Sequence, residues 1–151
     1  MKRTASAQWT GDLTTGGGTL STATGVLSST PYSYKSRFEQ GSGTNPEELL
    51  AAAHAGCFTM ALSLALGQAG MKPQSLETTC TITLEKRGEG FSITQSHLDL
   101  KAKVPGASKE AFENAVQQAK TNCPVSKLFS TEITLNSTLE SQQSSEAAAK
   151  R

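Results

Sequence analysis

The alternation of apolar and polar positions predicts three short strands at the start of the chain. They span residues 5–10, 19–27 and 31–38, and stretches rich in Gly, Ser and Thr separate them. In the third strand, Arg37 is expected to lie on the face opposite to the aromatic side chains. Short strands joined by turns are typical of antiparallel sheet.

A long apolar helix is predicted to follow these strands. Asn45 can cap it, Pro46 suits its first position, and the carboxylate of Glu48 can reach back to the cap amide. The uncharged run over residues 49–66 has the minimum length of a membrane span, but it contains polar residues and lacks flanking basic ones. We therefore predict a buried central helix and no membrane association.

The predicted helix is apolar on nearly every side, so protein must enclose it all round. A chain of 151 residues has little material left to do this alone. Small side chains on the helix would let another backbone approach closely: Ala51, Ala52, Ala53, Ala55, Gly56 and Ala61. We infer that part of the helix packs against a second copy of the chain.

A second block of strands and helix completes the predicted fold. A strand over residues 78–86 places Cys80 in the core, and its hairpin partner changes phase, which a β-bulge between residues 94 and 97 would explain. Ser108 is expected to cap a helix, and a last strand covers residues 130–139. The order βββ, α, ββ, α, β indicates an α+β domain with antiparallel sheets.

Length and charge restrict the domain organisation and the partners. Residues 1–140 are expected to form one domain, and residues 141–151, which offer nothing to bury, a disordered tail. The net charge is +1, and no long run of like charges marks a nucleic-acid or anionic-lipid surface. Three cysteines and an N-terminus without an apolar signal segment predict a reducing, cytoplasmic location.

Two of the three cysteines lie where thiol chemistry can occur. Burial of Cys57 in the apolar helix would raise its pKa, so a reactive thiolate there needs a cation close by. Cys123 precedes Pro124, and a turn starting there would direct backbone amides toward the Cys123 sulfur. From the residues alone, a redox pair, two structural thiols and a metal site that includes His54 all remain open.

Three segments, taken in their order and spacing, resemble one protein family. They are GTNPEEL at 43–49, AHAGCF at 53–58 and NCPVS at 122–126. The sequence is similar here to the OsmC/Ohr family of osmotically inducible and organic hydroperoxide resistance proteins, most of all to its OsmC branch. The resemblance extends from about residue 8 to residue 139 and departs at Gly56, where an alanine is common.

The resemblance implies an intertwined homodimer with two active sites at the subunit interface and no metal, haem or other cofactor. It implies a thiol-dependent peroxidase that reduces organic hydroperoxides, and hydrogen peroxide less efficiently. Cys57 falls on the family's peroxidatic position and Cys123 on its resolving position. The sulfenic acid of Cys57 would condense with Cys123 to a disulfide, which an outside dithiol such as a lipoyl group would reduce.

The arginine and glutamate of the family's site fall on Arg37 and Glu47. The guanidinium of Arg37 would stabilise the Cys57 thiolate and hold the peroxide oxygens. Ten residues of unbroken helix separate Glu47 from Cys57 by about 15 Å. Glu47 must therefore act through Arg37, unless the helix bends near Gly56.

Two rival functions follow from other interpretations of the same cysteines. A non-enzymatic, stress-induced binding or structural protein would hold its sulfurs too far apart to bridge. A metal site would use Cys57, His54 and Cys123, although their spacing is not that of common sites, and His54 is expected to be a packed core residue.

An apolar pocket for the alkyl part of a peroxide has four candidate lining residues: Tyr34, Phe58, Met60 and Leu64.

Overall fold

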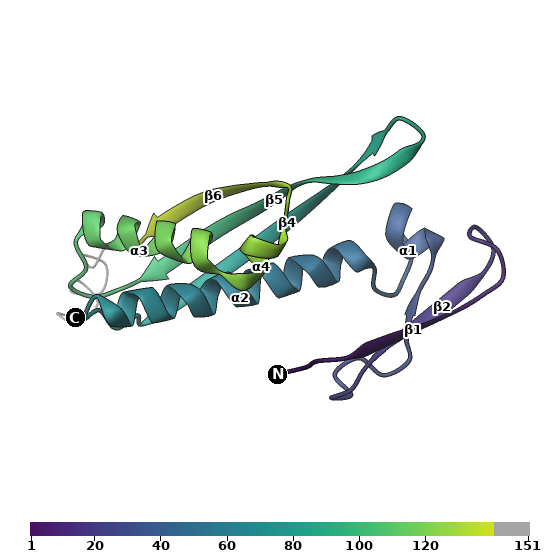
Figure 1. Cartoon of the computed structure of the whole chain (residues 1–151), viewed down its shortest axis with the longest axis horizontal. Helices are drawn as coiled ribbons and strands as arrows, with labels where there is room; N and C mark the ends of the chain where they lie inside the picture. Colours follow the sequence, from purple (N-terminus) through teal and green to yellow (C-terminus); the bar gives the residue numbers. More distant parts are fainter. Residues whose placement is uncertain (141–151) are drawn as a thin grey trace, which may run out of the picture. The chain divides into compact units, whose positions relative to one another are not determined.

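The computed structural model describes residues 1–140, so the predicted disordered tail lies outside the described residues. The chain forms two compact units, residues 1–49 and the residues from 50 onward. Each unit contains one three-stranded sheet (Figure 1). In the chain, helices come after the first sheet and again before the last strand of the second. The predicted α+β class is confirmed.

The sheet of the first unit is antiparallel, as predicted, with the strands in chain order. Its strands are β1 (Ala5–Thr10), β2 (Gly17–Thr22) and β3 (Thr30–Tyr32). The second strand ends earlier than the predicted residue 27, because Thr22 and Leu27 hydrogen-bond to each other and close a loop there.

The prediction of a strand over residues 31–38 is wrong beyond Tyr32. A short helix, α1 (Tyr34–Phe38), occupies this stretch and carries Arg37. Ser33 and Ser36 form a reciprocal capping box, in which each side-chain oxygen accepts a hydrogen bond from the other residue's backbone N–H, at 3.1 and 2.8 Å. This local pairing favours a helical turn over an extended strand.

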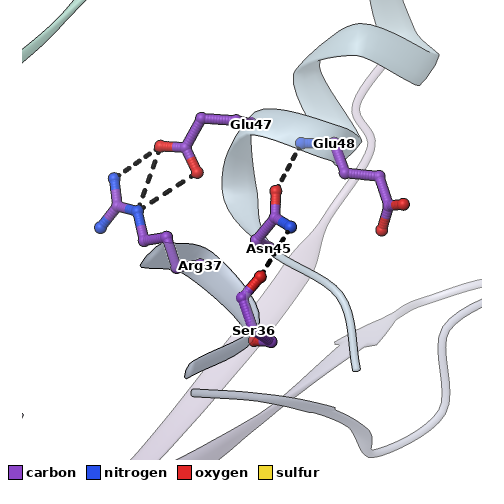
Figure 2. A network of polar contacts seen from close by, with 5 residues as sticks. All are labelled: Ser36, Arg37, Asn45, Glu47 and Glu48. Atoms are coloured by element: carbon purple, nitrogen blue, oxygen red, sulfur yellow. Dashed lines mark hydrogen bonds and ion pairs between the residues drawn. The ribbon is translucent and has the colours of Figure 1, made fainter. Parts of the chain in front are cut away.

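The long helix α2 (Pro46–Gln68) begins where the sequence predicts. The side chain of Asn45 caps it, accepting a hydrogen bond from the Glu48 amide at 2.8 Å, and also donates to the Ser36 carbonyl at 3.0 Å (Figure 2). The Glu48 carboxylate, however, accepts from the Thr44 hydroxyl at 2.8 Å instead of from the cap amide. Asn45 thus links α1 to the first turn of α2.

In the second unit, β4 (Ser75–Arg87) and β5 (Gly90–Lys103) form an antiparallel hairpin with the predicted bulge. Thr83 pairs with Gln95 and Leu84 pairs with Ile93, which leaves Thr94 as the extra residue. The third strand, β6 (Glu132–Leu139), runs parallel to β5, whereas an antiparallel sheet was predicted. The intervening helix carries the chain back to the starting end of β5, so the next strand runs in the same direction.

One hydrophobic core joins α2, β5 and α3 (Lys109–Asn122). The predicted cap of α3 is confirmed, since the Ser108 hydroxyl accepts a hydrogen bond from the Ala111 amide at 3.1 Å. One side of α3 is buried. The helix and strand residues that meet in this core include Phe58, Leu62, Leu66, Leu98, Leu100, Phe112, Ala115, Val116 and Ala119.

The second unit buries only one side of α2. Phe58, Leu62 and Leu66 have no exposed surface, whereas Met60 and Leu64 are 78% and 63% exposed. Within residues 1–140, α2 is the one helix whose length and hydropathy fit a membrane span, and 28% of its apolar window is buried. Its inward side chains build the core of a globular unit. The enclosing second copy stays a prediction.

Candidate active site

The second unit brings Cys57 and Cys123 together from distant parts of the sequence. Cys57 projects from α2, and Cys123 lies between α3 and the short helix α4 (Pro124–Leu128). All three cysteines are free thiols, and a hydrogen bond joins the Cys57 and Cys123 side chains. Cys123 is fully buried and Cys57 is partly exposed, so one sulfur of the pair is accessible.

The surroundings of Cys57 favour its protonated form. Burial raises the pKa of the Cys57 thiol, and the hydrogen bond to Cys123 and the charge of a Cys123 thiolate raise it further. One contact acts in the opposite direction, because the Val125 amide donates a hydrogen bond to the Cys57 sulfur and lowers the pKa. In the described part of the second unit, no basic side chain contributes to this balance.

The expectation that Cys123 receives the amides of the following turn is wrong. Cys123 occupies the cap position of α4, but its side chain makes no capping hydrogen bond. Its sulfur is buried against α2, and the amide of Val125 reaches Cys57. The turn therefore stabilises charge on the other cysteine of the pair.

The first unit holds Arg37 and Glu47 as an ion pair with several hydrogen bonds (Figure 2). Arg37 Nη2 lies 2.7 Å from Oε1 of Glu47, and Arg37 Nε lies 3.1 and 3.2 Å from the two carboxylate oxygens. The Arg37 side chain is 37% exposed and that of Glu47 is 12% exposed. α2 continues through Gly56 as one helix, so the alternative of a helix break there is not seen. Action of Glu47 through Arg37 stays a prediction.

The four predicted site residues thus form two contacting pairs, one in each unit. Sequence motifs place all four, but the contacts within each pair come from the fold. The bidentate geometry of Arg37 depends on α1, where a strand was predicted.

An open apolar pocket of about 550 Å³ lies beside Cys57. Met60 and Leu64 line it as predicted, whereas Phe58 is buried in the core and Tyr34 packs on Phe38 in the first unit, with ring centroids 5.0 Å apart. The remaining lining comes from the same helix and from α3 and its end: Ala61, Ala65, Gln68, Gln118, Ala119, Asn122 and Pro124. No local sequence pattern predicts that α3 contributes to this pocket.

His54 is a packed core residue, as predicted. It has no exposed surface, and its Nδ1 and Nε2 atoms lie 2.6 and 2.9 Å from the hydroxyls of Ser96 and Ser126. Burial lowers the pKa of His54, which keeps the ring neutral at physiological pH. Within residues 1–140, no three His, Cys, Asp or Glu side chains lie close enough to hold a metal ion.

Two thiols in contact beside an apolar pocket are the arrangement of a dithiol redox protein. The model of the OsmC-like protein family matches residues 39–138, and the chain belongs to this family. It is 50% identical over 135 residues to Peroxiredoxin OsmC of Escherichia coli (strain K12), covering 89% of this chain and 94% of that protein. The expected membership of the OsmC/Ohr family is confirmed.

Other relatives carry names from the second branch of the family. Organic hydroperoxide resistance protein-like 1 of Staphylococcus epidermidis is 38% identical over 101 residues, covering 66% of this chain and 71% of that protein. Among solved structures, an OsmC-like protein of unknown function from Vibrio cholerae superposes with a TM-score of 0.72 at 18% identity, covering 91% and 99% of the two chains. An organic hydroperoxide resistance protein of Elizabethkingia anophelis gives 0.66 at 26% identity, with 93% and 99% covered.

Proposed function

We propose that this protein is a thiol-dependent peroxidase that reduces organic hydroperoxides through Cys57. Relatives named Peroxiredoxin OsmC and organic hydroperoxide resistance protein support a peroxide-related redox function. The observation that carries the proposal is the contact between the Cys57 and Cys123 thiols, because it supplies both a peroxide-reducing sulfur and a partner to resolve it.

The proposed reaction uses these two sulfurs in turn. The Cys57 thiolate attacks one oxygen of the peroxide, the O–O bond breaks, and the alkoxide leaves as an alcohol after taking a proton. The Cys57 sulfenic acid then reacts with the Cys123 thiol, releasing water and forming a disulfide. An external dithiol, with lipoyl groups as candidates, reduces the disulfide and is itself oxidised to a disulfide.

Arg37 is proposed to supply the cation that the Cys57 thiolate needs. Burial raises the pKa of Cys57, so a guanidinium near the sulfur would be required to ionise it at neutral pH. Glu47 binds the Nε and Nη2 side of Arg37 and leaves Nη1 available for the sulfur or the peroxide oxygens. Glu47 is therefore assigned to orientation of the arginine.

We further propose that the chain acts as an intertwined homodimer whose subunit interface brings the Arg37–Glu47 pair to Cys57. The exposed apolar side of α2 supports this assembly, since a second copy would remove it from water. Its exposed residues include Ala52, Ala53, Gly56, Met60 and Leu64.

The apolar pocket supports the choice of organic hydroperoxides as substrates. Side chains of Met60 and Leu64 offer surface to an alkyl or aryl group next to the Cys57 sulfur. Hydrogen peroxide has no such group and would gain nothing from this contact. The alternative of a non-enzymatic structural protein requires sulfurs too far apart to bridge, and the thiol contact favours the enzyme.

The test is peroxide consumption with an organic hydroperoxide and dihydrolipoamide. We expect Cys57→Ser to abolish turnover and Cys123→Ser to consume about one equivalent of peroxide before stopping, since oxidation precedes resolution. Cys80→Ser is the matched control, because Cys80 is a third free thiol of the same unit, and it should keep the wild-type rate. Turnover at the wild-type rate in Cys57→Ser would refute the proposal.

A further inference from the structure

A buried hydrogen bond joins α2 to the short helix that carries Val125. Nε2 of His54 lies 2.9 Å from the Ser126 hydroxyl, and the two residues are 0% and 7% exposed. Shielded from water, this bond has no solvent competitor that would weaken it. Cys57 projects from the same helix as His54, one turn further on.

A second contact fixes the same short helix from its other end. The ring of Phe129, the residue that ends α4, packs edge-on against the His54 ring, with centroids 5.0 Å apart. Ser126 and Phe129 therefore both contact His54. Val125, whose amide donates to the Cys57 sulfur, directly precedes Ser126.

We propose that His54 and Ser126 are positioning residues, which hold the backbone amide of Val125 at the Cys57 sulfur. This role rests on the proposed function, in which Cys57 must carry negative charge. The neutral His54 ring, held between two hydroxyl groups, has one nitrogen to donate and one to accept, so it needs no ionisation to bind both. The bond between His54 and Ser126 thus acts on the reaction through Val125.

The contribution of the amide grows as charge develops on the sulfur. A backbone N–H bonds a thiolate more strongly than a thiol, so a correctly placed Val125 amide favours ionisation of Cys57. A shift of α4 away from α2 would lengthen the hydrogen bond from the Val125 amide to the Cys57 sulfur. It would also move Cys123, the residue that immediately precedes α4.

The experiment measures the pH profile of Cys57 alkylation by iodoacetamide in the reduced full-length protein, with the modified cysteine identified by mass spectrometry. We expect Ser126→Ala to slow alkylation at pH 7 about fivefold and to shift the profile to higher pH, the effect of losing one hydrogen bond. Ser126→Thr retains the hydroxyl and should restore the wild-type profile.

Ser96→Ala is the matched control, because it removes the other buried hydroxyl of the His54 ring. Among the described residues, the side-chain hydrogen bonds of Ser96 join it to His54 and Cys80 and not to α4. Its profile should shift by less than half as much. A wild-type profile in folded Ser126→Ala, or an equal shift in Ser96→Ala, would overturn the proposal.

A measurement on the wild-type protein covers the case in which Ser126→Ala does not fold. In ¹⁵N-labelled reduced protein, the amide signal of Val125 should shift with the same apparent pKa as Cys57 alkylation. A Val125 signal that does not respond to the ionisation of Cys57 overturns the proposal. Neither readout uses peroxide, so a failure here is distinct from the failure of peroxidase activity in the Cys57→Ser comparison.

Discussion

The Arg37–Glu47 pair of the first unit and the Cys57–Cys123 pair of the second differ in charge and in contact with water. Arg37 is 37% exposed and held by the carboxylate of Glu47. The thiols lie in a largely apolar setting, and burial raises the pKa of Cys57. Among the described residues of the second unit, no cation contributes to the pKa of Cys57, so a reactive thiolate there needs a cation from elsewhere. The Arg37–Glu47 pair, in turn, has no nucleophile of its own.

Replacing the cation is expected to have the largest effect. Arg37→Gln should lower kcat/KM for an organic hydroperoxide about 100-fold, because it removes a charged donor from the developing negative charge. Lys35→Gln is the matched control, since it removes the same charge from an exposed position of the same short helix. Steady-state kinetics with both variants checks this, and a loss below threefold in Arg37→Gln would contradict the assigned role.

The buried His54 of the second unit is expected to contribute to stability through its hydrogen bonds. His54→Gln should lower the free energy of unfolding by about 2 kcal/mol, since it disturbs two buried hydrogen bonds. The variant also tests the pH dependence of stability, because burial lowers the pKa of His54 below its usual 6.5.

The direction of that pH dependence follows from proton binding. As the pH falls through 6.5, the unfolded chain binds a proton at this histidine that the folded protein does not, so the wild-type protein loses stability. Urea unfolding between pH 7.5 and 5.5 should show this loss in the wild type and in His97→Gln, and a flatter profile in His54→Gln. Parallel profiles in all three proteins would exclude a neutral buried His54.

The orienting role of Glu47 predicts a smaller effect than the loss of the arginine. Glu47→Gln should lower kcat/KM about tenfold, because the Arg37 charge remains but loses its ionic partner. If Glu47 acts only through Arg37, adding Glu47→Gln to Arg37→Gln should cost little further activity. Additive losses in the double variant would show an independent role for the carboxylate, and Glu39→Gln on the exposed end of α1 serves as the control.

Gly56 offers the smallest predicted effect. Within residues 1–140, a Cβ atom at this position would meet no atom within 4 Å outside the adjoining backbone of its own helix, and alanine favours a helix over glycine. Gly56→Ala should therefore raise the free energy of unfolding by about 0.5–1 kcal/mol without loss of activity. Chemical denaturation measures this directly, and a destabilised variant would contradict the prediction by showing that the proposed second copy leaves no room for a Cβ atom here.

The sequence predicts those parts of the fold that depend on local patterns. The Asn45 cap, the hairpin bulge at Thr94 and the apolar stripe of α3 all follow from residue spacing. The strand expected at Arg37 was wrong because aromatic residues two apart mimic strand alternation, although Tyr34 and Phe38 are also one helical turn apart. The parallel direction of β6 depends on a crossover that no local pattern records.

The candidate site, like the fold, could be predicted from the sequence only in part. Family motifs place Cys57, Cys123, Arg37 and Glu47, but they do not reveal which cysteine accepts the Val125 amide. That depends on the direction of the buried Cys123 side chain, a property of tertiary packing. The bond between His54 and Ser126 likewise joins residues 72 positions apart and leaves no trace in spacing.

If Cys57 and Cys123 form the redox pair, peroxide should join them in a disulfide. The reduced protein is treated with one equivalent of an organic hydroperoxide, quenched with an alkylating agent and mapped by peptide mass spectrometry that separates the three cysteines. We expect a Cys57–Cys123 disulfide with Cys80 alkylated as a free thiol. Recovery of Cys57 as an alkylated thiol after the peroxide has been consumed would contradict it.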